Sequence, residues 1–158
     1  MKNSSRNNQI NGVVVDTSVL VEYMSLDPED EKDLKLLSFL KSNILESKEY
    51  QAVYITSLTL TELLYVLCRK YGWKTAKKYI DDLSENLIIL RLPDSEELAA
   101  HIKCKIPIAL ADCYSMAVSA LFSLPVYFMK EKELTKELQK KLEKEFSIDL
   151  HIIDKEEK

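Results

Sequence analysis

Short apolar runs alternate along the chain with longer segments whose apolar residues recur at helical spacing. The runs consist mainly of Val, Ile, Leu and aromatic residues, a composition typical of strands buried on both faces of a parallel sheet. We predict strands over residues 13–15, 52–56, 87–92, 124–129 and 148–153, with the last at an edge of the sheet. We predict helices over residues 17–24, 30–47, 57–71, 74–84, 94–103, 110–122 and 132–146.

This order of elements predicts an α/β fold built from βαβ units. A central, mostly parallel sheet of four or five strands should form the middle of three layers, with helices on both faces. The sequence shows no internal repeat and no low-complexity linker, so residues 12–154 are expected to form a single domain. Residues 1–11 are polar and lack the apolar segment of a signal peptide, and we predict that they form a flexible tail.

Composition narrows the class of protein. Only two of the 158 residues are glycine, which argues against a glycine-rich phosphate-binding loop. The formal net charge is −4, so the chain lacks the excess of basic residues typical of a passive nucleic-acid binder. This negative charge does not argue against an enzyme that binds phosphate groups through metal ions.

Cysteines and hydropathy indicate the compartment. The three cysteines have neither a CxxC motif nor zinc-ligand spacing, so we expect buried, reduced thiols in the cytoplasm. No apolar run reaches the length of roughly 18 residues that a transmembrane helix requires. The sequence therefore predicts a cytoplasmic protein without a membrane partner.

Three acids lie close to the end of a predicted strand or to the start of a predicted helix. Asp16 follows the first strand directly; an Asp there is often the N-cap of the next helix, although Thr17 or Ser18 would serve equally. Glu62 lies near the start of the helix after the second strand, where Thr59 and Glu62 also match a capping box. Asp112 stands among apolar residues, where an unpaired carboxylate is costly. The alternative is that Asp112 caps a helix that begins there.

A fourth acid is less defined. Glu131 and Glu133 both follow the fourth strand, and either of them is also explained as a solvated acid near a helix N-terminus. Because the carboxyl ends of parallel strands meet at one edge of the sheet, we expect the four acids to converge. A carboxylate cluster without His or Cys is the ligand set of Mg²⁺ or Mn²⁺, and metal-assisted phosphodiester hydrolysis is the matching chemistry.

Three stretches, in this order, resemble the PIN domains, and especially the VapC-type toxin ribonucleases of prokaryotic toxin–antitoxin pairs. The stretches are VVVDTSVLVEYM, TSLTLTELLYVLCRKYG and ALADCYSMAVSALFSLPVYF, and the resemblance covers roughly residues 12 to 135. It implies a PIN-like three-layer fold and endoribonuclease activity on single-stranded RNA. It also implies a homodimer and inhibition by a cognate antitoxin protein.

The resemblance also assigns residues. It implies that Asp16, Glu62 and Asp112 are catalytic acids that hold the metal, and that Ser18 helps to order the site. The family's fourth acid usually follows a T-x-D pattern, whereas this strand ends FMKEKE; Glu131 is the first choice by spacing and Glu133 the substitute. This departure leaves a second hypothesis open, namely a degenerate PIN-like module that binds RNA or a protein partner without cleaving RNA.

Basic residues on two predicted helices are candidates for holding the RNA strand. They are Arg69, Lys70, Lys74, Lys77 and Lys78. The common alternative for such a charge run is a solvated helix face. The sequence does not decide between the two.

Overall fold

The computed structural model describes residues 11–91 and 93–157 and has the predicted α/β architecture. A sheet of five parallel strands runs in the order β3-β2-β1-β4-β5, so the predicted last strand does lie at an edge. The strands are β1 (Gly12–Val15), β2 (Ala52–Thr56), β3 (Ile88–Leu90), β4 (Val126–Met129) and β5 (Leu150–Ile153). Leu92, the end of the predicted third strand, and residues 1–10 of the predicted tail over residues 1–11 lie outside the described residues.

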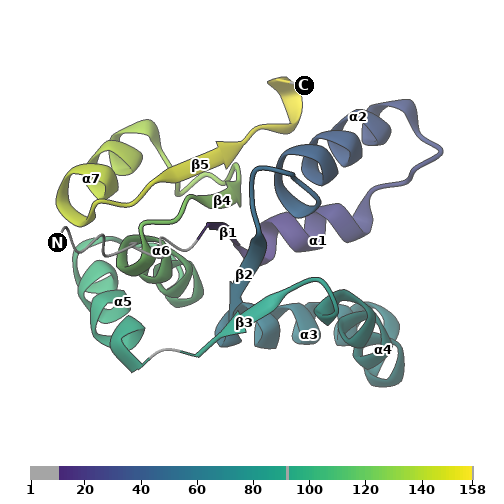
Figure 1. Ribbon diagram of the computed structural model, residues 1–158, viewed down its shortest axis with the longest axis horizontal. Helices are drawn as coiled ribbons and strands as arrows, with labels where there is room; N and C mark the ends of the chain where they lie inside the picture. The colour runs from purple at the N-terminus through teal and green to yellow at the C-terminus, as the bar shows by residue number, and fades with distance from the viewer. Residues whose placement is uncertain (1–10, 92, 158) are drawn as a thin grey trace, which may run out of the picture.

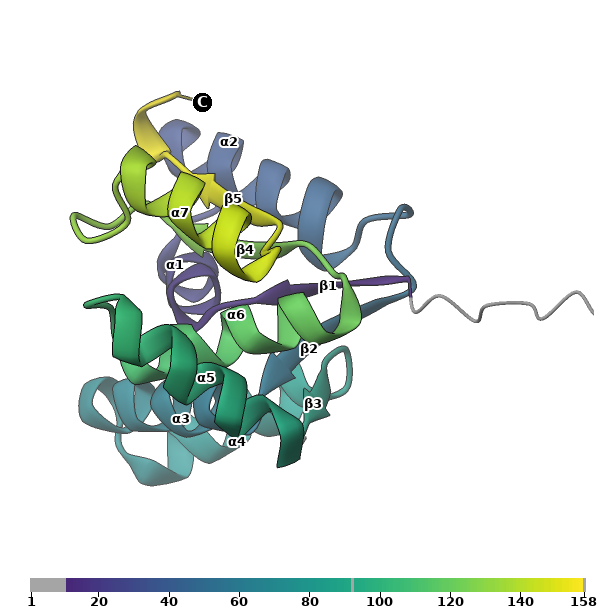
Figure 2. The same ribbon diagram turned by 90° about the vertical axis from the view of Figure 1, so that its left-hand side faces the viewer.

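Helices cover both faces of this sheet (Figures 1 and 2). The α-helices are α1 (Thr17–Ser25), α2 (Glu31–Leu40), α3 (Ser57–Tyr71), α4 (Trp73–Ser84), α5 (Pro93–Lys105), α6 (Leu110–Phe122) and α7 (Lys136–Phe146). None of the helices within the described ranges combines the length and apolar character needed to span a membrane.

Two hydrophobic cores lie on opposite faces of the sheet. Val13 and Val15 of β1 pack in the core under α1 to α4, whereas Val14 packs in the core under α5 to α7. All three valines are fully buried, which explains why the run contains no polar residue. The central strand is thereby anchored on both faces, and its carboxyl end is held at a fixed place.

Several predicted boundaries are corrected. The helix predicted over residues 132–146 begins only at Lys136, because the Thr135 hydroxyl caps it by accepting the Leu138 N–H at 3.2 Å. The segment predicted as one helix over 30–47 continues beyond α2 as a π-helical turn, Lys41–Leu45. Cysteine burial is also mixed: Cys113 is buried, but Cys104 is exposed, and all three thiols are free.

Candidate metal centre

A pocket of about 520 Å³ opens at the carboxyl edge of the sheet, beyond the ends of β1 and β4. We call it the acidic pocket, because acids outnumber bases among its charged side chains. These side chains are Asp16, Glu22, Glu62, Asp112, Glu131, Lys130 and Lys155. The structure therefore brings together Asp16, Glu62, Asp112 and Glu131, whereas Glu133 does not line the pocket.

Asp16 is both a helix cap and the most buried acid of the pocket. Its Oδ2 accepts the Ser18 N–H at 2.9 Å and the Ser18 hydroxyl at 2.8 Å, so Asp16, rather than Thr17 or Ser18, caps α1. Its other oxygen, Oδ1, accepts the Ser115 hydroxyl at 3.4 Å. With 2% of its surface exposed, the side chain is fixed in position as well as buried.

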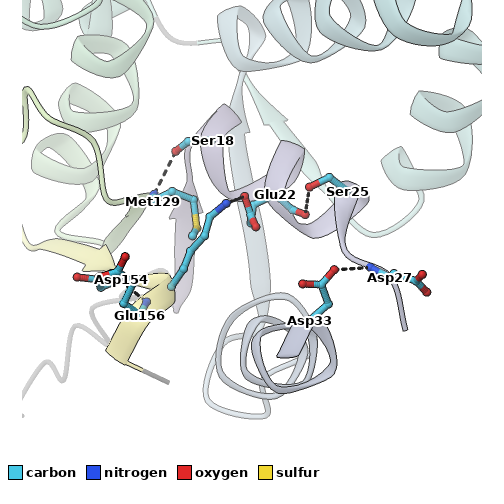
Figure 3. Close-up of polar contacts among 9 residues, drawn as sticks. Ser18, Glu22, Ser25, Asp27, Asp33, Met129, Asp154 and Glu156 are labelled. Carbon is cyan, nitrogen blue, oxygen red and sulfur yellow. Dashed lines mark hydrogen bonds and ion pairs between the residues drawn. The ribbon is translucent and has the colours of Figure 1, made fainter. Parts of the chain in front are cut away.

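Ser18 connects Asp16 to the end of β4. Its Oγ donates to Asp16 and accepts the Met129 N–H at 3.1 Å, and Figure 3 shows the second of these contacts. The hydroxyl therefore links the carboxyl ends of β1 and β4. This link fits the predicted role of Ser18 in ordering the site, and that role stays a prediction.

Glu62 lies in the second turn of α3, and the predicted capping box is wrong. Thr56 caps this helix instead, since its Oγ1 accepts the Thr59 N–H at 3.0 Å. The Glu62 Oε2 accepts the Thr17 hydroxyl at 2.7 Å, which directs the carboxylate toward α1 and the pocket. A structural capping role therefore does not explain this glutamate.

Asp112 is the third residue of α6, not its cap, because Ala109 holds the N-cap position. Burial, followed by the charges of Asp16, Glu131 and Glu62, raises the pKa of Asp112 to about 7. The pKa of Asp16 is also raised, mainly by burial, and so is that of Glu131, by burial and then by neighbouring acids. The electrostatics of the pocket thus disfavour the simultaneous ionisation of these acids.

Glu22 is a pocket acid that the sequence reasoning missed. It follows Ser18 by one helical turn on α1, a spacing that would have placed both on one face of the helix. Its carboxylate forms an ion pair with Lys155, next to the C-terminal turn shown in Figure 3. Lys155 itself has no local sequence signal, because only the course of the chain after β5 brings it to the pocket.

The predicted RNA-binding residues do not line the acidic pocket. Arg69 donates to the Tyr65 hydroxyl at 2.8 Å, and the Lys70 Nζ lies 5.0 Å from the centroid of the Tyr71 ring. Lys74 is exposed in the first turn of α4. These contacts fit a solvated helix face, and RNA binding by these residues stays a prediction.

The donor set of the pocket fits a magnesium or manganese ion. It offers carboxylate oxygens without His or Cys. Burial and neighbouring acids raise the pKa of Asp16, Asp112 and Glu131, and a nearby divalent cation would oppose that shift. Within residues 11–91 and 93–157, however, no group of three or more acids, His or Cys already stands at ligating positions. Asp16, Glu62, Asp112 and Glu131 would therefore reach a shared ion only after side-chain rotation.

The raised pKa of Asp112 predicts that the metal-free protein becomes less stable as pH rises. Between pH 3.8 and about 7 the folded state keeps a proton that the unfolded chain has released, so the free energy of unfolding falls with increasing pH. Lowering the pH from 8 to 6 should restore about 1 kcal/mol through this group. Urea unfolding in the presence of a chelator measures the change. A pH dependence as steep in Asp112→Asn as in wild type would contradict the assignment.

The fold and the pocket define a class of protein: a parallel α/β domain with acids converging at the carboxyl edge of its sheet. The sequence model of the PIN domain matches residues 13–136. The chain belongs to the PIN domain family, which confirms the resemblance. The search of curated proteins found no match.

Solved structures share the fold at low sequence identity. VapBC2 from Rickettsia felis, bound to a DNA fragment from its promoter, is 13% identical, with a TM-score of 0.59 over 90% of this chain and 97% of that one. FitAcB from Neisseria gonorrhoeae is 21% identical, with a TM-score of 0.55 over 90% and 97%. VapC20 from Mycobacterium tuberculosis, a sarcin–ricin loop cleaving toxin, is 18% identical, with a TM-score of 0.55 over 73% and 87%. These likenesses extend over most of each chain and confirm the predicted PIN-like fold.

Proposed function

We propose that this chain is a metal-dependent endoribonuclease that cleaves single-stranded RNA as the toxin of a toxin–antitoxin pair. The observation that carries the proposal is the acidic pocket, where Asp16, Glu62, Asp112 and Glu131 come from four separate segments to one place. Membership of the PIN domain family supports nuclease chemistry. The similarity to VapC20, described as a cleaving toxin, supports RNA as the substrate and toxicity as the outcome.

In this proposal Asp16, Glu62 and Asp112 hold Mg²⁺ or Mn²⁺, and Glu131 is the fourth acid. The ion would polarise the scissile phosphate and stabilise the charge that develops during hydrolysis. Ser18 keeps Asp16 in place through its two hydrogen bonds. Glu131 is the most exposed of the four acids, on the loop after β4, and is suited to orient the attacking water.

A cognate antitoxin, a homodimer and a cytoplasmic location belong to the same proposal. Solved structures with this fold include toxin–antitoxin complexes, such as the one from Klebsiella pneumoniae, which supports an antitoxin partner. Exposed aromatic residues on α3 and α4, among them Tyr71, Trp73 and Tyr79, offer apolar area for a protein partner. Light scattering that gives the 18.3 kDa monomer mass at micromolar concentration would contradict the homodimer.

The FMKEKE segment favours a second function, a PIN-like module that binds without cleaving. It contains neither the threonine nor the aspartate that usually follow this strand in the family. Glu131 does line the acidic pocket, so a fourth carboxylate is present despite the departure from the pattern. Binding of RNA without any cleavage would identify the second function.

Cleavage of a mixed-sequence, single-stranded RNA tests the proposed function. We expect fragments in the presence of Mg²⁺ or Mn²⁺ and intact RNA after chelation, because the acids alone cannot stabilise the charge that develops on the phosphate. Gel analysis of end-labelled RNA measures the result, and a double-stranded RNA of the same sequence is the control. Intact RNA with both metals would reject the nuclease function, and cleavage in excess chelator would reject its metal dependence.

A further inference from the structure

We propose that Lys130 and Lys155 contact the phosphates of the bound RNA and mark the side from which the strand enters the acidic pocket. This inference rests on the proposed function. A single-stranded RNA is a polyanion, and five acids line the pocket that must receive it. The lysines at positions 130 and 155 are the basic side chains among the pocket-lining residues, so they are placed to offset this repulsion.

Lys155 lies in the C-terminal 3₁₀ turn, Lys155–Glu157, and extends to Glu22 on α1. The Glu22 side chain is only 14% exposed, whereas that of Lys155 is 58% exposed. The ion pair therefore holds the ammonium group at the mouth of the pocket without burying it. Because an ammonium has three N–H donors, Lys155 can keep Glu22 and also donate to a phosphate.

Lys130 is held in the same manner on the other side of the turn. It directly follows β4 and pairs with Asp154, whose side chain is 15% exposed against 62% for the lysine. Asp154 also accepts the Glu156 N–H at 3.1 Å, as Figure 3 shows, which fixes the turn that carries Lys155. Each of the two lysines is thus paired with an acid whose side chain is largely buried.

A second hollow continues from the acidic pocket along this side. Its volume is about 330 Å³, and it shares Lys130, Glu131 and Lys155 with the acidic pocket while adding Lys132, Asp154 and Glu156. An RNA strand that has one phosphate at the acids can therefore extend over the C-terminal turn and meet a further lysine. Arg69, Lys70 and Lys74 on α3 and α4 line neither hollow. A route over the C-terminal turn can therefore be tested against a route over α3 and α4.

Fluorescence anisotropy of a labelled, mixed-sequence 12-nucleotide RNA tests this route, using Asp112→Asn protein with Mn²⁺ to suppress cleavage. We expect Lys130→Ala and Lys155→Ala each to weaken binding roughly fivefold at about 0.1 M salt and to reduce the slope of log K against log[salt] by about 0.7. Lys155→Arg should keep the affinity, because the charge remains. Lys48→Ala is the matched control, since Lys48 is exposed just before β2, at the opposite edge of the sheet.

A further variant separates phosphate contact from the release of Glu22. Glu22→Gln should bind RNA at least as well as its parent, and Glu22→Gln/Lys155→Ala should still lose affinity if Lys155 contacts a phosphate. Unchanged affinity in both lysine variants, or an equal loss in Lys48→Ala, overturns the route. So does a loss confined to Lys70→Ala and Lys74→Ala. If wild-type protein binds RNA through these lysines but never cleaves it, the route is supported and the nuclease function is rejected. Failure of the route and failure of the proposed function are therefore distinguishable.

Discussion

We expect Asp112→Asn to lower RNA cleavage by on the order of 10³-fold and, at pH 8, to make the metal-free protein more stable. Asparagine has the shape of aspartate but no negative charge, so the variant would lose the proposed metal ligand and with it the several kcal/mol that a bound ion would contribute to the reaction. The same change removes the repulsion from Asp16, Glu131 and Glu62 that, after burial, raises the pKa of Asp112. Opposite effects on activity and stability are typical of a functional acid.

Single-turnover cleavage with Mn²⁺ and urea unfolding with chelator measure the two effects. Asp94→Asn is the matched control, because Asp94 is an exposed acid in the first turn of the neighbouring helix α5 and does not line the acidic pocket. It should leave the cleavage rate within about twofold of wild type, as expected of a surface substitution that changes stability by less than about 0.5 kcal/mol. Cleavage by Asp112→Asn within threefold of wild type would contradict its assignment as a metal ligand.

The three best-defined acids were predictable because the parallel topology determines where strand ends lie. Asp16 follows a run of valines, and parallel strands bring their carboxyl ends to one edge regardless of loop length. Glu62 and Asp112 stand near the starts of the helices that begin at the same edge. The sequence thus predicts their convergence without any knowledge of side-chain conformation.

Other features of the pocket depend on the paths of loops and of the C-terminus. Glu131 and Glu133 are two residues apart, and the later start of α7 leaves both in a loop, where periodicity cannot say which one faces the pocket. The ion pair of Glu22 with Lys155 joins residues more than a hundred positions apart. Its formation depends on the course of the chain after β5, for which local patterns carry no signal.

The start of α7 shows a similar limit within the fold. Alternating Lys and Glu at residues 130–133 favour a helix by intrinsic propensity, and the predicted helix therefore begins too early. In the structure the Thr135 hydroxyl satisfies a free backbone N–H at the helix start, and this cap determines the boundary. Glu131 lies in the loop before this cap and lines the acidic pocket.

We expect Phe128→Ala to lower the free energy of unfolding by about 3–5 kcal/mol, a large part of the roughly 5–15 kcal/mol typical of a single domain. Phe128 is fully buried on β4 and belongs to the core under α5 to α7. Truncation would leave a cavity beside the strand, and the surrounding residues would close it only partly. The next residue, Met129, donates its N–H to Ser18, so a displaced strand also disturbs the hydrogen bonds that position Asp16.

Urea unfolding at pH 6 with chelator measures this loss, and Ile88→Ala is the control. Ile88 is also a large apolar residue in the sheet, but it lies on the edge strand β3 and is 47% exposed, so its truncation should cost under about 1.5 kcal/mol. An equal loss of unfolding free energy in the two variants would contradict the prediction that the packing of β4 contributes more to stability than that of the edge strand β3. If Phe128→Ala is the more damaging, added Mn²⁺ should recover part of its stability, because an ion that binds only the folded state favours that state.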